Sequence, residues 1–231
     1  MTTLVFDLDD TLYDQLLPFK KAVQKSFSFP ADQIEDLYLM SRKYSDEVFE
    51  LTHSGKMSLV DMHVYRIQNA CAQWGMDLTF DQALCFQKAY QSYQDQISLF
   101  DNLARILTDC CQRDIQLVLM TNGPTEHQYR KIRQLDLTNW IPAEKIFISE
   151  KVGFSKPDRR FFDYVSKQLS LKERQTYYVG DSYENDIVGA KRANWQAVWF
   201  NHRNHLQPTS NYQYDYLLTD SNSLLSFVAN L

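Results

Sequence analysis

Four aspartates lie within nine residues near the start of the chain, in the stretch FDLDDTLYD. Asp7, Asp9, Asp10 and Asp14 follow directly after the apolar run 4–6. Like charges repel, and removing several carboxylates from water beside a hydrophobic core is costly. A divalent cation, or a reaction that moves protons and phosphate, would explain why the chain brings these oxygens together.

Three later loops carry further polar side chains, and each follows a segment that is typical of a strand. The first is TNG at 121–123, the second is GFSKPD with Lys156, and the third is GDSYEND with Asp181 and Asp186. In open parallel sheets, ligands bind beyond the carboxyl ends of the strands. The hydroxyl, lysine and carboxylates of these loops therefore predict one site, shared with the aspartates that follow the first strand.

The elements that must position these loops alternate between strand and helix patterns. Short apolar runs suited to buried parallel strands are expected at 3–6, 115–120, 145–148, 176–179, 197–200 and 216–218. Helical patterns are expected at 103–112, 126–135, 159–169 and 185–193. The alternation predicts an α/β fold with a Rossmann-like, doubly wound parallel sheet.

The long segment between the first two strands differs, because its apolar residues recur at helical intervals throughout. Ser58 and Thr79 are expected to cap two of its helices. The pattern predicts three or four amphipathic helices in a small bundle, inserted after the first strand. We therefore expect a core domain formed by residues 1–14 and 98–231, and an α-helical domain formed by residues 15–97.

Composition and charge narrow the class of protein. Of the 231 residues, 44% are hydrophobic and 23% are charged, which is typical of a globular chain. A net charge of -5 argues against a nucleic-acid partner. The sequence shows no secretory signal pattern, no apolar run long enough for a membrane span, and four cysteines without metal-ligand spacing. These features predict a cytoplasmic protein with reduced thiols and no membrane partner.

The motifs DLDDT, TNG, KPD and GDSYEND occur in this order, each after a predicted strand. They resemble the four signature motifs of the haloacid dehalogenase (HAD) superfamily of hydrolases. The resemblance covers the whole chain, and residues 15–97 match an α-helical cap inserted at the first cap position. One departure is Ala193-Asn194, where many relatives have Ala-Gly. Asparagine also adopts the left-handed conformation, so we expect the turn to survive.

The resemblance implies a Mg²⁺-dependent reaction on a small phosphorylated metabolite. Asp7 is then the nucleophile that forms an aspartyl-phosphate, and Asp9 is the general acid and base. The Mg²⁺ ion is expected to be held by Asp7, by the backbone carbonyl of Asp9 and by Asp181, because this ion prefers oxygen ligands. Lys156 is expected to neutralise charge on the phosphate and on Asp7.

The resemblance also implies roles for the residues around this centre. The Thr121 hydroxyl and the Asn122 backbone amide are expected to hold the phosphoryl group together with Lys156. Asp186 is expected to lie behind the metal ligands and to orient either metal-bound waters or Lys156, and Thr11 is expected in the same outer layer.

Each assignment has a plainer alternative, because Asp, Asn and Thr are common turn residues. Asp10 and Asp14 could serve only in turns, Thr11 and Thr121 could be turn caps, and a lysine before a proline could be a solvated loop residue. The set as a whole favours the functional interpretation, because four unrelated turns would rarely supply these groups in this order.

Asp9 also discriminates between reactions. Dehalogenases of the superfamily lack the second aspartate, because a departing halide needs no proton, so Asp9 favours phosphoryl transfer. The stretches TNGPTEHQ and SEKVGFSKPD are most similar to the pyrimidine 5′-nucleotidase branch, which implies a nucleoside 5′-monophosphate as substrate. The alternatives are a sugar-phosphate or FMN phosphatase, a phosphomutase, and a non-catalytic regulator with a HAD fold. The sequence predicts no oligomeric state.

Overall fold

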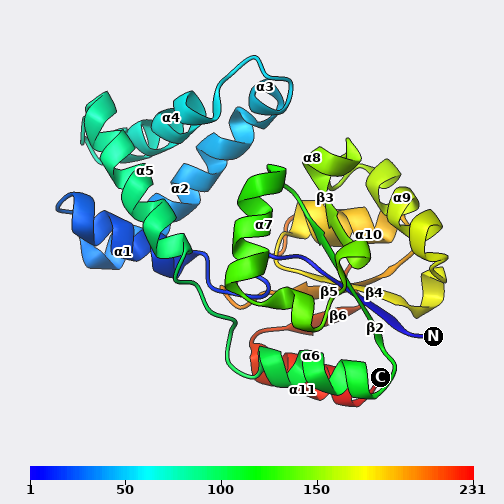
Figure 1. Cartoon of the computed structure of the whole chain (residues 1–231). Helices are drawn as coiled ribbons and strands as arrows, with labels where there is room; N and C mark the ends of the chain where they lie inside the picture. Colours follow the sequence, from blue (N-terminus) through cyan, green and yellow to red (C-terminus); the bar gives the residue numbers. More distant parts are fainter. The chain divides into compact units, whose positions relative to one another are not determined.

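The computed structural model describes residues 1–231, apart from the side chain of His53. The chain forms two compact units (Figure 1). Met1–Asp14 and Ser98–Leu231 form the first, which we call the sheet unit. Gln15–Ile97 form the second, which we call the helical insertion. Because the insertion leaves the sheet unit at one point of the sequence and returns at another, the sheet unit is built from two separate stretches of chain.

The sheet unit contains a six-stranded sheet with the order β3-β2-β1-β4-β5-β6, and all neighbouring strands are parallel. The strands are β1 (Thr3–Phe6), β2 (Gln116–Thr121), β3 (Ile146–Ile148), β4 (Thr176–Gly180), β5 (Gln196–Phe200) and β6 (Tyr216–Leu218). In the register, Val5 of β1 lies between Val118 of β2 and Tyr178 of β4. The predicted α/β fold with a parallel sheet and an early helical insertion is confirmed.

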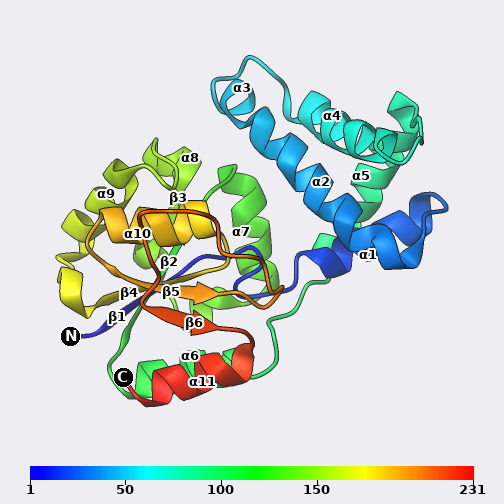
Figure 2. The same ribbon diagram turned by 180° about the vertical axis from the view of Figure 1, so that it is seen from behind.

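Helices cover both faces of the sheet, which explains why its central strands are almost entirely apolar. On one face lie α6 (Leu103–Gln112) and α11 (Ser221–Ala229), and on the other lie α9 (Arg159–Leu169) and α10 (Gly189–Arg192) (Figures 1 and 2). The remaining helices of the unit are α7 (Thr125–Gln134) and α8 (Ser149–Val152). Short 3₁₀ turns occupy Leu137–Asn139, Ala143–Lys145 and Glu173–Gln175.

The segment after β4 differs from the regular helix predicted at 185–193. Tyr183–Val188 forms a π-helical turn, and a regular α-helix occupies only Gly189–Arg192. The wide turn is closed by Ser182, whose carbonyl accepts hydrogen bonds from the backbone N–H groups of Asp186 and Ile187. The wider spacing turns Asp186 back towards β4, and such π-turns often occur at functional sites. The turn after α10 is as expected, because Asn194 has a φ of 59°.

The helical insertion contains α1 (Leu16–Ser26), α2 (Ile34–Glu47), α3 (Phe49–His53), α4 (Leu59–Ala72) and α5 (Phe80–Gln94), with a 3₁₀ turn at Ala31–Gln33. The prediction of three or four helices missed the break at Val48, which separates α2 from the short α3. The predicted caps are confirmed. Ser58 accepts a hydrogen bond from the backbone of Asp61, and Thr79 forms a capping box with Gln82.

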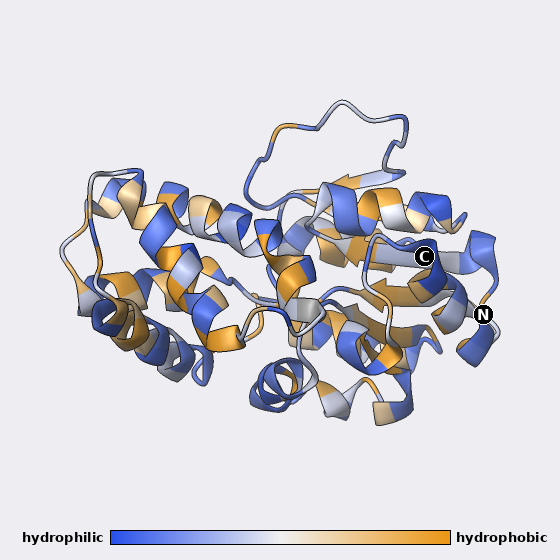
Figure 3. Cartoon of the chain, turned by 90° about the horizontal axis from the view of Figure 1, so that it is seen from above, coloured by the Kyte–Doolittle hydropathy of each residue, from blue (hydrophilic) through white to orange (hydrophobic). Residues whose placement is uncertain are grey.

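The insertion has its own hydrophobic core, in which Phe19, Ile67 and Phe86 are buried among α1, α2, α4 and α5. Figure 3 shows the resulting pattern: helices alternate between hydrophobic and hydrophilic residues, whereas the strands of the sheet unit are mostly hydrophobic. No helix among the described residues combines the length and the apolar character that a bilayer span requires.

Candidate active site

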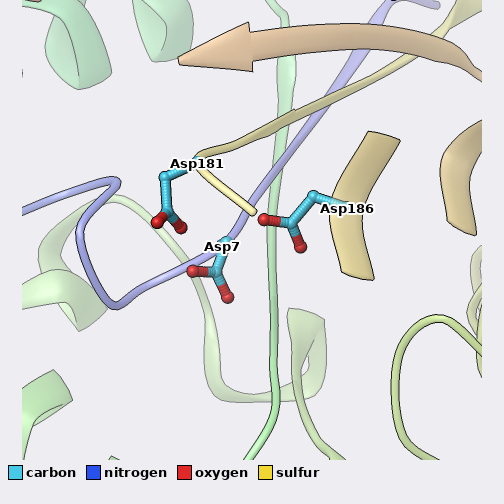
Figure 4. Close-up of side chains that lie close together, drawn as sticks. All are labelled: Asp7, Asp181 and Asp186. Atoms are coloured by element: carbon cyan, nitrogen blue, oxygen red, sulfur yellow. The ribbon is translucent and has the colours of Figure 1, made fainter. Parts of the chain in front are cut away.

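Three carboxylates converge where β1 and β4 end (Figure 4). Asp7 directly follows β1, Asp181 directly follows β4, and Asp186 comes from the π-helical turn. Each residue contributes one carboxylate oxygen, and these three oxygens lie within 4.8 Å of one another. The Asp186 carboxylate packs so closely against the backbone of Gly180 that this position requires a glycine. A Cβ atom there would lie 2.3 Å from an oxygen of Asp186. Parallel strands therefore bring residues far apart in sequence to one point.

Lys156 supplies positive charge to this cluster. Its Nζ lies 2.5 Å from Asp7 Oδ1, 2.7 Å from Asp186 Oδ1 and 2.8 Å from the hydroxyl of Tyr178, and its side chain is buried. The Asn122 side chain fixes the loop, because it accepts a hydrogen bond from the backbone N–H of Lys156 and donates one to its carbonyl. The charge-assisted contacts hold the lysine directly against Asp7.

The electrostatics of the cluster favour a further cation. Burial raises the pKa of Asp7 to about 7, although the Lys156 ammonium opposes this shift. Burial also raises the pKa of Asp181 well above its usual range, and the negative charges of Asp10, Asp186 and Asp7 add to the effect. Among the described residues, Lys156 forms ion pairs with Asp7 and Asp186 but not with Asp181, so ionising all three carboxylates is costly without more positive charge.

The donor set fits Mg²⁺, because every candidate ligand is an oxygen atom. No hydrogen bond or ion pair of the described residues occupies the Asp181 carboxylate. Asp186 differs, because one of its oxygens binds Lys156 and the other accepts a hydrogen bond from the backbone N–H of Ser182. Asp7 and Asp181 therefore have more capacity for a metal ion than Asp186 does.

Asp9 lies in a separate set of contacts. Lys131 Nζ lies 2.6 Å and 2.8 Å from its two carboxylate oxygens, the Tyr13 hydroxyl donates to Oδ1, and Gln128 Nε2 lies 3.0 Å from Oδ2. Burial opposes ionisation of Asp9, but the Lys131 charge and these hydrogen bonds outweigh it, so the pKa falls well below its usual range. Asp7 and Asp9 thus have opposite shifts, although only Leu8 separates them.

The structure identifies three neighbours of Asp9 that no sequence motif indicates: Tyr13, Gln128 and Lys131. Gln128 and Lys131 both belong to α7 and are three residues apart, so they lie on the same side of that helix. The spacing was the available signal. It was not distinctive, because polar residues three apart are common on solvated helix faces.

Thr121 and Asn122 lie at the end of β2. The Thr121 hydroxyl oxygen is 2.6 Å from Gln128 Nε2, so the same amide nitrogen contacts both Thr121 and Asp9. Gly123 follows with a φ of 140°, a conformation that side chains disfavour. The TNG loop is thereby fixed between α7 and the Lys156 loop.

The remaining aspartates of the opening stretch contact an arginine. Arg203, in the loop after β5, donates hydrogen bonds to Asp10 at 2.7 Å and to Asp14 at 2.6 Å. Asp10 also has a φ of 56°, so it is a turn residue and an ion-pair partner at once. The buried hydroxyl of Thr11 has no hydrogen-bond partner among the described residues, so no contact here tests its predicted role.

Known proteins resemble this chain over most of its length. The family model described as "Haloacid dehalogenase-like hydrolase" matches residues 4–200 of this chain. The putative HAD-hydrolase YfnB of Bacillus subtilis is 27% identical over 203 residues, which are 86% of this chain and 83% of YfnB. The crystal structure of YfnB bound to magnesium has a TM-score of 0.74 at 23% identity and covers 98% of both chains.

Two further relatives are named for activities on phosphate esters. Pyrimidine 5′-nucleotidase PynA of Streptococcus pneumoniae is 27% identical over 91% of this chain and 89% of PynA. Glyceraldehyde 3-phosphate phosphatase of Methanothermobacter thermautotrophicus is 26% identical over 87% of this chain and 86% of that protein. With the family match spanning most of the sequence, the chain belongs to the haloacid dehalogenase-like hydrolases.

Proposed function

We propose that the chain is a Mg²⁺-dependent phosphatase that hydrolyses small phosphomonoesters through an aspartyl-phosphate on Asp7. The observation that carries the proposal is the meeting of Asp7, Asp181 and Asp186 within 4.8 Å, with Lys156 against Asp7. Such a site supplies a nucleophile, a lysine charge and oxygen ligands at one point, which phosphoryl transfer requires.

The reaction has two halves. In the first, an oxygen of Asp7 bonds to phosphorus, the bond from phosphorus to the substrate oxygen breaks, and Asp9 gives its proton to that oxygen. In the second, water attacks the phosphorus of the aspartyl-phosphate, Asp9 takes a proton from the water, and the bond from Asp7 to phosphorus breaks. Inorganic phosphate leaves, and Asp7 and Asp9 regain their starting forms.

The groups around Asp7 would orient the substrate. The Thr121 hydroxyl and the Asn122 backbone amide would bind phosphoryl oxygens, and Lys156 would stabilise negative charge on them. The carboxylates of Asp7 and Asp181 and the backbone carbonyl of Asp9 would hold Mg²⁺, with Asp186 behind them holding Lys156. When bound, Mg²⁺ would neutralise charge on the phosphate and so allow the anionic Asp7 to approach.

Asp9 favours a phosphatase over a dehalogenase. A departing alkoxide needs a proton whereas a halide does not, and Asp9 lies two residues after the proposed nucleophile. A HAD-fold regulator without activity would be expected to lack one of these groups. Asp7, Asp9, Lys156 and Asp181 are all present.

For the substrate, we propose a nucleoside 5′-monophosphate. The motif context and the similarity to PynA support this choice. A sugar phosphate is the second candidate, supported by the similar identity to the glyceraldehyde 3-phosphate phosphatase. FMN and a phosphomutase reaction have only the motif context in their favour.

The test is a phosphate-release screen over nucleoside monophosphates, sugar phosphates and FMN, with and without Mg²⁺. Asp7→Asn serves as the blank. We expect Mg²⁺-dependent release that the variant lacks, and a preference for UMP, dUMP or dTMP. Preference for a sugar phosphate would overturn the nucleotidase proposal, and release that is unaffected by Asp7→Asn would overturn the phosphatase mechanism.

A further inference from the structure

We propose that Lys131 and Gln128 are positioning residues that hold the carboxyl group of Asp9 in line with the departing substrate oxygen. The inference rests on the proposed phosphatase function, in which Asp9 transfers the proton. Neither side chain needs to touch the substrate for this role, because both act through Asp9.

The contacts define the direction of the Asp9 carboxylate. Lys131 donates to both carboxylate oxygens, at 2.6 Å and 2.8 Å, while Tyr13 and Gln128 each donate to one. An exposed aspartate rotates about its side-chain bonds. An aspartate whose two carboxylate oxygens accept hydrogen bonds from Lys131, Tyr13 and Gln128 is held in a single orientation. Donors at both oxygens suit the carboxylate form, which Asp9 takes after it has given up its proton.

Burial distinguishes these helix residues from ordinary surface residues. Lys131 is 3% exposed and Gln128 is 1% exposed, although both belong to a helix rich in polar residues. Burying a lysine is costly unless a carboxylate compensates for it, and the Asp9 carboxylate forms an ion pair with Lys131. Desolvation of the Lys131 ammonium is thus offset, at least in part, by its ion pair with Asp9.

Gln128 connects Asp9 to the proposed phosphate-binding loop. Its Nε2 lies 3.0 Å from Asp9 Oδ2, 2.6 Å from the hydroxyl oxygen of Thr121 and 3.0 Å from the carbonyl oxygen of Asn122. One amide thus fixes the distance between the residue that transfers the proton and the residues that would hold the phosphoryl group. This distance must be correct for the proton to reach the departing oxygen as the bond to phosphorus breaks.

The experiment measures kcat/KM for phosphate esters whose leaving groups differ in their need for a proton. A nucleoside or alkyl phosphate releases an alkoxide that must be protonated, whereas 2,4-dinitrophenyl phosphate releases a stable anion. For Lys131→Met we expect roughly a 10- to 100-fold loss on the alkyl and nucleoside esters, as part of the contribution of general acid catalysis. On the dinitrophenyl ester we expect a loss below about 3-fold.

Three variants complete the design. Arg133→Met removes an exposed cation from the same helix and should leave every ester unaffected. Lys131→Arg should recover part of the lost activity on the alkyl ester. Gln128→Leu keeps the ion pair of Asp9 and should give a smaller loss with the same dependence on the leaving group, so it tests the inference even if Lys131→Met does not fold.

A double mutant separates positioning from general damage. In an Asp9→Asn background, Lys131→Met should cause no further loss on the alkyl ester, because its effect passes through Asp9. Equal losses on all esters for Lys131→Met and Gln128→Leu, or additive losses in the double mutant, would overturn the inference. The proposed function fails differently: the wild type would release no phosphate, or Asp7→Asn would remain active.

Discussion

The sheet unit and the helical insertion bury very different side chains. At the end of β1 and β4, the sheet unit buries Asp7, Asp186 and Lys156 side by side. The insertion buries aromatic rings instead, and Phe19 and Phe86 meet edge to face with centroids 5.2 Å apart. Apolar packing stabilises a fold, whereas buried charges are retained when chemistry requires them. The difference indicates where stability has been given up for function.

The first test of this comparison replaces the proposed nucleophile. Asp7→Asn should lower phosphate release by at least about a thousandfold, because covalent catalysis requires the carboxylate. The fold should survive, since the variant also removes one of three crowded negative charges. Phosphate release and thermal unfolding of the metal-free protein check both parts. A variant that lost activity only because it unfolded would contradict the distinction between the two regions.

The second test removes a ring from the core of the insertion. Phe86→Ala should lower the free energy of unfolding by about 3–5 kcal/mol, because Phe86 is 0% exposed and its removal leaves a cavity. Phe80→Ala is the matched control on the same helix: its ring is 50% exposed, and the expected loss is within about 0.5 kcal/mol.

A chain with two compact units need not unfold in a single transition, so hydrogen exchange of the α5 amides should be measured together with urea unfolding. A loss below about 1 kcal/mol for Phe86→Ala would show that the insertion does not depend on its packed core.

The third test adds the cation that the sheet unit is expected to bind. Mg²⁺ at 100 times its dissociation constant should stabilise the wild type by about 2.7 kcal/mol, through preferential binding to the folded state. Asp181→Asn should abolish most of this gain, because no hydrogen bond or ion pair of the described residues occupies the Asp181 carboxylate, which leaves it available to the ion. Thermal unfolding of wild type and variant with and without Mg²⁺ measures the stabilisation by the ion. Equal stabilisation of wild type and variant would place the ion elsewhere.

The smallest expected effect concerns a histidine of the insertion. Burial, with a contribution from Arg66, lowers the pKa of His63 from 6.5 to about 3. As the pH falls below 6.5, the unfolded chain binds a proton that the folded chain does not, so stability is lost towards pH 3. His63→Gln should therefore lose less stability than the wild type between pH 7.5 and pH 5. Urea unfolding of wild type and variant at the two pH values measures the free energy of unfolding. An equal loss of this free energy in both proteins would contradict the prediction.

Much of the fold follows from the sequence, because the buried strands are continuous apolar runs between turn residues. The bounds of β1, β6, α6 and α9 are those expected from pattern alone. The π-helical turn at Tyr183–Val188 was not predicted, since its width depends on packing against β4 rather than on local propensity. The break at Val48 was missed because the apolar periodicity continues across it.

The residues of the candidate site could also be predicted only in part from the sequence. The motifs indicated Asp7, Lys156 and Asp181, because each follows a strand or lies in a loop beyond one. Lys131 and Arg203 were not indicated, because a lysine in a polar helix and an arginine in a long loop are usually solvated. Only the tertiary structure brings them within hydrogen-bond distance of Asp9 and Asp10.

The most direct test of the central claim is detection of the phosphorylated aspartate. The enzyme is mixed with substrate and Mg²⁺, quenched in acid, reduced with borohydride and digested, and the peptide that contains Asp7 is sequenced by mass spectrometry. The account predicts that Asp7 alone is converted to homoserine, and only when substrate is present. Turnover with unmodified Asp7 under the same quench, or conversion of a different carboxylate, would contradict it.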